Sequence, residues 1–257
     1  MAVSRVLARV ARPPGGPADR RGVYQAVLAR DECEVRDAQR LRYQVFAVEQ
    51  GARLPSAADG LDVDGFDRVC DHLLVRDEAT AEVVGAYRLL PPGRSEQLLS
   101  REGFELDAIT SLHGGLVEIG RACVHQGHRN GLVVLCLWAG ILRYMTERRF
   151  RWLGGCASMS LADGGTRASA AWQTVRARHY APAAYRVRPR TPWIPQDSAP
   201  CPPAAVPSLL RGYLMLGAWV CGPPALDSDF RTADLFTLLA VDRVPAGRLD
   251  PLWAVAS

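Results

Sequence analysis

Apolar residues recur along most of this chain with two periods, one typical of strands and one typical of helices. The run GVYQAVLAR at 22–30 has the length and composition of a buried strand. Asp31 comes directly after it, with Glu34 three residues later, which predicts an N-cap and a helix extending to about Gln50. One face of that helix is apolar and carries Val35, Ala38, Leu41, Val45 and Phe46.

Turn-forming segments divide the rest of the chain into short elements. Residues 78–81 separate two strand-like runs and predict a hairpin. Six prolines between Thr191 and Pro207 exclude regular structure and predict a loop at 191–207. The mixed order of elements favours an α/β (α+β) fold with three layers around a mostly antiparallel sheet. Strands are predicted at 69–77, 82–90, 116–124, 151–158 and 234–241, and helices at 131–149 and 166–178.

The N-terminal residues 1–21 form a basic segment ahead of this pattern. Val3, Val6, Leu7 and Val10 fall at helical spacing, with arginines on the other side. Residues 1–14 therefore form either a basic amphipathic helix able to contact the inner membrane surface or a flexible tail. We expect residues 22–257 to form a single domain, because a chain of 257 residues can bury one sizeable core.

Composition narrows the function classes. The net charge is only +4, so nothing in the charge indicates nucleic-acid binding. All 31 basic residues are arginine, which excludes a Schiff-base lysine. Seven cysteines without a Cys-x-x-Cys pair fit buried thiols in a reducing cytoplasm, and we expect a cytoplasmic protein. Cys123, His125 and His128 have a metal-like spacing but no partner cluster elsewhere, so we expect no metal site.

Several charges interrupt apolar segments, where an unpaired charge is costly. Glu118 and Arg121 lie within the strand predicted at 116–124, and Arg42 lies in the apolar stripe of the first helix. If Arg42 is a site residue, Arg42→Met should cost activity far more than stability. Such charges belong either to structural ion pairs or to a functional site. Glu49 shares that stripe with Arg42. The other members of this set are Arg88, in the strand predicted at 82–90, and Asp64 and Asp67, in the loop before the strand predicted at 69–77.

The same residues carry a family resemblance. The motifs LRYQVF, DVDGFD, CDHLLV, YRLLP and EIGRACVH occur here in the order seen in the acyl-ACP-dependent branch of the GNAT acyltransferases, where ACP is the acyl carrier protein. The chain resembles the bacterial ornithine N-acyltransferases in GRACVHQGHRNG, GCAS and GYLMLGAWVCGPPALDSDFRTAD, and more distantly the acyl-homoserine-lactone synthases. The resemblance extends from about Arg40 to Val241.

This resemblance implies a GNAT-like fold whose sheet is splayed at its central strand. It also implies transfer of a long (3-hydroxy)acyl chain from acyl-ACP to the α-amine of ornithine or a similar amino acid, the first step of ornithine lipid synthesis. No bound cofactor or metal is implied; the donor carries its own phosphopantetheine thioester. The partners are then ACP and the amino acid. The alternatives are an autoinducer synthase or a non-catalytic GNAT-like binding module.

Acyl transfer to an amine needs a proton acceptor, and Glu118 is the candidate base, with Arg121 as the second catalytic residue. Residues 118 and 121 would face opposite ways in a regular strand, so we expect a bulge at Gly120 to bring them to one side. The alternative is a purely structural ion pair of Glu118 with Arg121 or Arg88. The resemblance assigns substrate binding to Arg42, Phe46, Asp64, Asp67 and Arg88.

The segment after the strand predicted at 116–124 indicates which acyl donor the protein uses. GNAT enzymes that use coenzyme A usually place glycines there, so that backbone N–H groups hold the pyrophosphate. This chain has Gly131 one place early, and Leu132 and Val133 come after it. Side chains at those positions should obstruct phosphate, which favours acyl-ACP over acyl-CoA. The residues expected to contact the carrier or its pantetheine are Val124, His125, Arg129 and Asn130.

Overall fold

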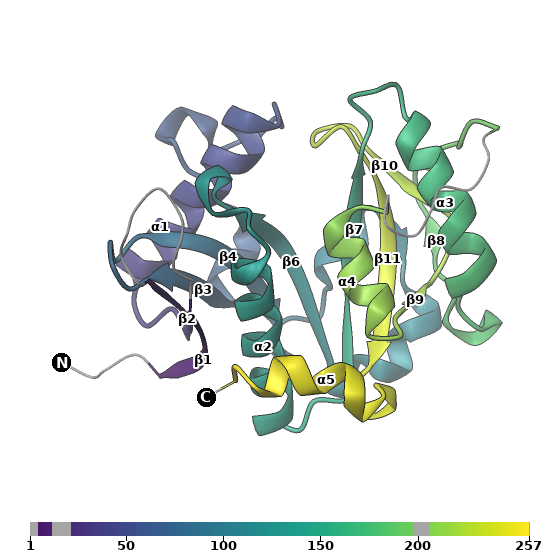
Figure 1. The fold of residues 1–257 in the computed structure, drawn as a ribbon. Coiled ribbons are helices and arrows are strands. Elements are labelled where there is room, and N and C mark those ends of the chain that lie inside the picture. The colour runs from purple at the N-terminus through teal and green to yellow at the C-terminus, as the bar shows by residue number, and fades with distance from the viewer. Residues whose placement is uncertain (1–4, 12–21, 198–205, 257) are drawn as a thin grey trace. The chain divides into compact units, whose positions relative to one another are not determined.

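The structure, a computed structural model, describes residues 5–11, 22–197 and 206–256 (Figure 1). Its chain separates into two compact units, and β6 (Leu116–Val124) contributes residues to both. The first unit comprises Met1–Leu90, Gly120–Arg149 and Ala246–Ser257, and the second Pro91–Ile119 and Phe150–Pro245. The single domain expected at 22–257 therefore stays a prediction.

The first unit is built on four strands that are consecutive in the chain and antiparallel to their neighbours (Figure 1). Sheet order continues from the fourth of them to β6. The hairpin predicted around residues 78–81 is present as β3 and β4. The elements are β1 (Val6–Ala11), β2 (Val23–Leu28), β3 (Asp71–Asp77), β4 (Val83–Leu90), α1 (Glu32–Tyr43), α2 (Leu132–Glu147) and α5 (Ala246–Trp253).

Helices cover both faces of this sheet. Leu73 of β3 lies against Gly140 of α2, where an added Cβ would meet the leucine side chain at 3.2 Å. The preceding residue, His72, is paired across the sheet with Arg88 of β4. Since neighbouring strand residues point to opposite faces, these two side chains turn away from α2 and toward α1. The first unit thus has three layers, and its α1 face carries the charged residues.

The predicted first helix is confirmed, with a change of winding near its end. Asp31 is the N-cap, and its side chain accepts a hydrogen bond from Glu34 N at 3.0 Å. The α-helix ends at Tyr43 and continues as a π-helical segment over Gln44–Glu49. One extra residue in a turn rotates the side chains beyond it, and π-helical turns occur frequently at functional sites.

The N-terminal helix expected within residues 1–14 is wrong for its described part, because Val6–Ala11 is strand β1. Ala8 and Val10 are buried whereas Arg9 and Ala11 are exposed, so the segment also fits a period of two. Pairing with β2 supplies ladder hydrogen bonds, whereas a helix this short would carry the full nucleation cost. Residues 1–4 and 12–21 lie outside the described residues, and membrane contact stays a prediction.

The second unit contains the C-terminal half of the sheet. The first residues of β6 pair in parallel with β7, which is antiparallel to β11. Two short strands, β9 and β10, also pair with β11, and β5 pairs with β8. The elements are β5 (Phe104–Glu105), β7 (Trp152–Ser160), β8 (Arg188–Pro189), β9 (Trp219–Val220), β10 (Ala225–Asp227), β11 (Thr232–Ala240), α3 (Thr166–His179) and α4 (Ser208–Met215).

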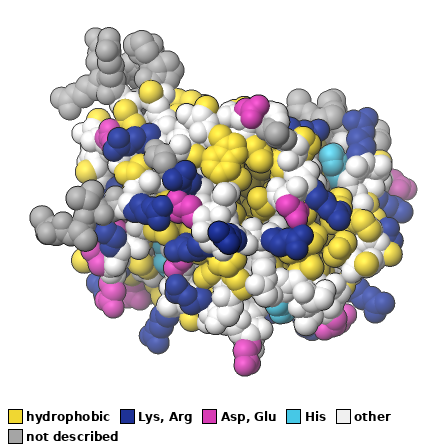
Figure 2. Space-filling view, turned by 90° about the horizontal axis from the view of Figure 1, so that it is seen from below, with side chains coloured by type: hydrophobic (Ala, Val, Ile, Leu, Met, Phe, Trp, Pro, Cys, Tyr) yellow, Lys and Arg dark blue, Asp and Glu magenta, His cyan; other side chains and the backbone are white. Residues whose placement is uncertain are grey.

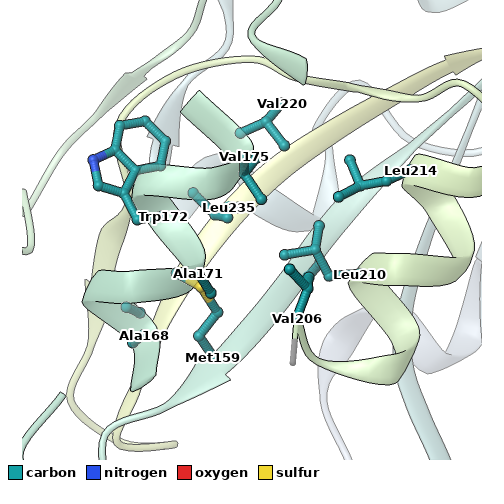
Figure 3. Packing of buried hydrophobic residues seen from close by; sticks show 12 residues of the cluster. Met159, Ala168, Ala171, Trp172, Val175, Val206, Leu210, Leu214, Val220 and Leu235 are labelled. Atoms are coloured by element: carbon teal, nitrogen blue, oxygen red, sulfur yellow. The ribbon is translucent and has the colours of Figure 1, made fainter. Parts of the chain in front are cut away.

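Two apolar clusters lie on opposite faces of β7 and β11. On one face Met159 and Leu235 pack against Trp172 of α3 and Leu210 of α4 (Figure 3). Phe236 belongs to the other cluster, one residue along β11. Alternating side chains of β7 and β11 are thus buried on both faces of the sheet in the second unit. The expected α/β fold with a largely antiparallel sheet is confirmed.

Candidate active site

Opposite charges gather on the α1 face of the first unit. Arg42 Nη2 lies 2.8 Å from Asp67 Oδ2, and Arg42 Nε lies 3.0 Å from Asp62 Oδ2. Arg88 Nη1 lies 2.6 Å from Asp64 Oδ1. Of the predicted site residues, the structure brings together Arg42, Asp64, Asp67, Arg88 and Arg121, and it adds Asp62.

Local hydrogen bonds fix the aspartates of this ionic cluster. Asp64 begins a short 3-10 helix at Gly65–Arg68, and its side chain accepts from Phe66 N at 2.8 Å. Asp67 returns a contact to Asp64 N at 3.3 Å, which completes a capping box. The DVDGFD motif therefore positions two carboxylates through hydrogen bonds with its own backbone, in addition to their contacts with the arginines.

Burial separates the interior of the ionic cluster from its rim. Burial by itself would raise the pKa of Asp67, but the hydrogen bonds and charge of Arg42, together with Arg88, hold that pKa far below its usual range. The Arg42 and Arg88 side chains are 1% and 4% exposed. Asp64 and Arg121, by contrast, keep 31% and 27% of their side-chain surface exposed, 3.6 Å apart. Asp64 and Arg121 therefore form the exposed rim of the ionic cluster, and Arg42, Asp67 and Arg88 form its buried interior.

Arg121 has an unusual backbone. Its φ is +56°, in the left-handed region that residues with a Cβ seldom adopt, in the middle of β6. The bulge expected at Gly120 stays a prediction; the residue with the left-handed backbone is its neighbour, Arg121. The guanidinium is held by Asp62, with Nε 3.1 Å from Oδ2. Strain of this kind persists where the surroundings over-determine it, and it is frequent at functional sites.

Glu118 lies in the second unit and is completely buried, with 0% exposure. Its carboxylate accepts from Ser100 N at 2.9 Å, from Ser100 Oγ at 2.5 Å and from Leu99 N. These two amides open the 3-10 helix Leu99–Glu102, so the glutamate caps that helix from a distant strand. Three hydrogen-bond donors stabilise an ionised carboxylate, the form that a general base requires.

The sequence pattern did not identify three residues that contact the predicted site residues: Asp62, Ser100 and Cys156. Asp62 belongs to the same loop as Asp64, and its even spacing from that residue was the available signal. Ser100 is 18 residues from its partner Glu118, and Cys156 lies 3.1 Å from Ser100 Oγ. A lone serine in a loop carries no pattern, so only the fold could identify it.

Phe46, the remaining residue predicted to bind substrate, is 8% exposed on the π-helical segment. Its backbone oxygen accepts a hydrogen bond from Ala52 N at 2.8 Å. The side chain therefore lies in the core of the first unit. Contact between Phe46 and a substrate stays a prediction.

The segment between β6 and α2 is held by its own side chains. Arg129 Nε donates to Val124 O at 3.1 Å, and Arg129 Nη2 lies 2.5 Å from Glu49 Oε2. Asn130 Oδ1 accepts from Leu132 N at 3.0 Å, so it occupies one of the backbone donors at the start of α2. His125 Nδ1 accepts from Gly127 N at 3.2 Å. The residues predicted to contact the acyl carrier or its pantetheine therefore lie together, Val124 at the end of β6 and the others in the loop that follows it.

Four other side chains have nucleophilic or acid–base chemistry, and each is buried or in contact with another side chain. Burial raises the pKa of the Cys123 thiol to about 12, so a thiolate nucleophile is strongly disfavoured there. Tyr144 donates to Asp71 Oδ2 at 2.8 Å, and Tyr180 lies beneath Arg186 at 4.7 Å. His128 Nδ1 lies 2.9 Å from Tyr24 Oη. Within the described ranges, no three His, Cys, Asp or Glu side chains come together as metal ligands would.

Comparison with known proteins identifies the class. Residues 41–139 match the acetyltransferase (GNAT) domain family. The AHL synthase LasI has the same fold, with a TM-score of 0.52 at 13% identity over 92% of this chain and 96% of that chain. The chain is an acyltransferase of the GNAT class, as the motifs predicted. None of the helices in the described ranges is long and apolar enough to cross a membrane.

Two curated relatives narrow the class to a family. An L-ornithine N(alpha)-acyltransferase of Agrobacterium fabrum is 32% identical, over 88% of this chain and 84% of the relative. Another, of Rhodobacter capsulatus, is 33% identical over 84% of this chain and 89% of the relative. The chain belongs to the L-ornithine N(alpha)-acyltransferase family.

Proposed function

We propose that this protein transfers a long acyl or 3-hydroxyacyl chain from acyl-ACP to the α-amine of ornithine, the first step of ornithine lipid synthesis. The names of its relatives support ornithine as the acceptor. The observation that carries the proposal is the pair of opposite charges left half-exposed at the rim of the ionic cluster, Asp64 and Arg121. Ornithine has a side-chain ammonium and a carboxylate, which complement that pair.

The acceptor is held by charge at both ends. Asp64 takes the side-chain ammonium of ornithine, and Arg121 takes its carboxylate. Arg88, at 2.6 Å from Asp64, holds the rim carboxylate in place, and Asp62 does the same for Arg121. An amino acid bound through both of these groups presents its α-amine in one orientation, which lowers the entropic cost of the reaction.

Glu118 acts as the base in this proposal. The neutral α-amine attacks the thioester carbonyl, and its excess proton passes to Glu118 as the C–N bond forms. Collapse of the tetrahedral intermediate breaks the C–S bond, and the proton leaves with the phosphopantetheine thiol. Glu118 and Arg121 belong to one strand, and three residues of chain span at most about 11 Å.

The loop between β6 and α2 favours ACP as the donor. Its Leu132 N–H is already bound to Asn130, and the guanidinium of Arg129 is bound to Glu49. Those groups would otherwise attract the pyrophosphate of coenzyme A, which phosphopantetheine on a carrier protein lacks. Figure 2 shows basic side chains, all of them arginine, dispersed over one face among acidic and hydrophobic ones. Such arginines suit an acidic carrier protein.

Norvaline tests the acceptor site, because it is ornithine without the side-chain ammonium. We expect norvaline to be acylated with a kcat/KM at least about tenfold below that of ornithine, since a hydrogen bond to a charged group contributes roughly 1.5–3 kcal/mol. Asp64→Asn should lower kcat/KM for ornithine by a similar factor and leave norvaline within about twofold. Initial rates measured by mass spectrometry with both acceptors give these ratios.

Asp59→Asn is the matched control, because Asp59 lies in the same loop as Asp64 and is exposed. It should keep the full preference for ornithine. Equal kcat/KM values for ornithine and norvaline with the wild-type protein would show that Asp64 does not bind the side-chain ammonium.

A further inference from the structure

Three polar groups form a continuous hydrogen-bonded chain in the second unit. Cys156 Sγ lies 3.1 Å from Ser100 Oγ, which in turn lies 2.5 Å from Glu118 Oε1. The three residues come from β7, the 3-10 helix Leu99–Glu102 and β6. Both Glu118 and Ser100 are buried, so these contacts are made away from bulk solvent.

The protonation of the two end residues, Cys156 and Glu118, decides which atom donates in each of these hydrogen bonds. Burial raises the pKa of Cys156 well above its usual value, so its sulfur keeps its proton and donates to the serine oxygen. A serine hydroxyl carries one proton. With the thiol as donor on one side, Ser100 directs that proton at the carboxylate, which matches the short contact to Oε1.

Glu118 cannot take a proton from a substrate by direct contact in this structure, because its exposure is 0%. Ser100 is also buried, but 8% of the residue stays exposed, and its hydroxyl touches the carboxylate. The backbone amides of Leu99 and Ser100 also donate to Glu118. An amide does not give and take protons readily, whereas a hydroxyl both donates and accepts. The hydroxyl is thus the member of this set that can convey a proton inward.

We infer that Ser100 relays the substrate proton to Glu118, with Cys156 orienting its hydroxyl. The inference rests on the proposed role of Glu118 as the base. As the amine nitrogen bonds to the thioester carbon, its N–H proton moves to Ser100 Oγ. The serine proton moves at the same time to Glu118 Oε1, so Ser100 stays neutral. When the C–S bond breaks, the same two transfers run in reverse and protonate the leaving thiolate.

Ser100→Ala and Ser100→Thr test the relay in the full-length protein. General acid–base groups contribute about 10²–10⁴ to rate, so we expect Ser100→Ala to lower kcat at least about tenfold. The KM for ornithine should stay within about twofold, because the acceptor is held elsewhere. Ser100→Thr, which keeps a hydroxyl, should recover kcat to within about threefold of wild type. Ser95→Ala is the matched control, because the Ser95 hydroxyl bridges the backbone of Gln97 in the same segment.

A double variant separates a relay from simple support of the fold. In a Glu118→Gln background, Ser100→Ala should lower kcat by less than about twofold further, since both residues serve one path. If Ser100→Ala lowered kcat as much in the Glu118→Gln background as in the wild type, the relay would be overturned. The relay would also be overturned if Ser100→Ala reduced the amount of folded protein but kept kcat per folded molecule. A Ser100→Ala enzyme as fast as wild type, beside an inactive Glu118→Gln, rejects the relay but keeps the base. An active Glu118→Gln rejects both.

Discussion

Replacing Glu118 with glutamine should lower kcat by at least about a hundredfold, the usual contribution of a general base. Glutamine fills the same volume but cannot accept a proton at neutral pH. The structure adds an expected cost in stability. The glutamine NH₂ group would face either the Ser100 donors or Leu99 N, and a buried donor without an acceptor costs roughly 1–3 kcal/mol. The rate must therefore be expressed per folded molecule.

Glu105→Gln provides the matched control for that measurement. Glu105 lies in the same unit, on β5, and is exposed. The expected outcome is wild-type kcat and an unchanged Tm. Should Glu118→Gln retain kcat within a few-fold of wild type per folded molecule, the carboxylate would be a structural cap for residues 99–102 and not the base.

Arg42→Met should be the most destabilising substitution in the ionic cluster. The arginine is 1% exposed and neutralises Asp62 and Asp67, whose side chains are 3% and 5% exposed. Removing one partner of a buried ion pair costs roughly 3–5 kcal/mol. Asp62 would keep Arg121 and Asp67 would keep Arg88, but both carboxylates would lose their most buried partner. From the charge pattern, a site role for Arg42 predicted that this substitution would cost activity far more than stability, whereas a structural ion pair predicted large destabilisation. The two buried carboxylates favour the second outcome.

Chemical denaturation of Arg42→Met and Arg40→Met measures this effect. Arg40 lies on the same helix, but it pairs with Asp37 at the surface, where ion pairs contribute about 0–1 kcal/mol. We therefore expect a large loss of unfolding free energy for the first variant and almost none for the second. Similar stability of the two variants would mean that Asp62 and Asp67 do not depend on Arg42.

The sequence could predict the parts of this fold whose periodicity is unambiguous. The strand at 116–124 was expected with the bounds that β6 has, because a mostly apolar segment of nine residues lies there between turn signals. The strand at Val6–Ala11 was missed because a six-residue segment satisfies both helical and strand spacing. Pairing with β2 decides between helix and strand for this segment. The local sequence pattern does not predict that pairing.

The candidate site was predictable to the extent that its charges interrupt apolar elements. Arg42, Arg88 and Glu118 could be recognised because each lies within such an element. The pattern could not give the division between interior and rim, since Asp64 and Asp67 are indistinguishable in a polar loop. Likewise, the contact of Ser100 with Glu118 depends on a loop returning over 18 residues to a strand. Such contacts arise from packing and have no signature in spacing.

One measurement tests the proposed function most directly: the product formed from ornithine when the same 3-hydroxyacyl chain is offered on ACP and on coenzyme A. Tandem mass spectrometry distinguishes acylation at the α-amine from acylation at the side-chain amine. We predict Nα-acylornithine alone, with kcat/KM for the ACP thioester far exceeding that for the coenzyme A thioester. Acylation of the side-chain amine, no product from acyl-ACP, or equal use of the coenzyme A thioester would contradict the proposed function.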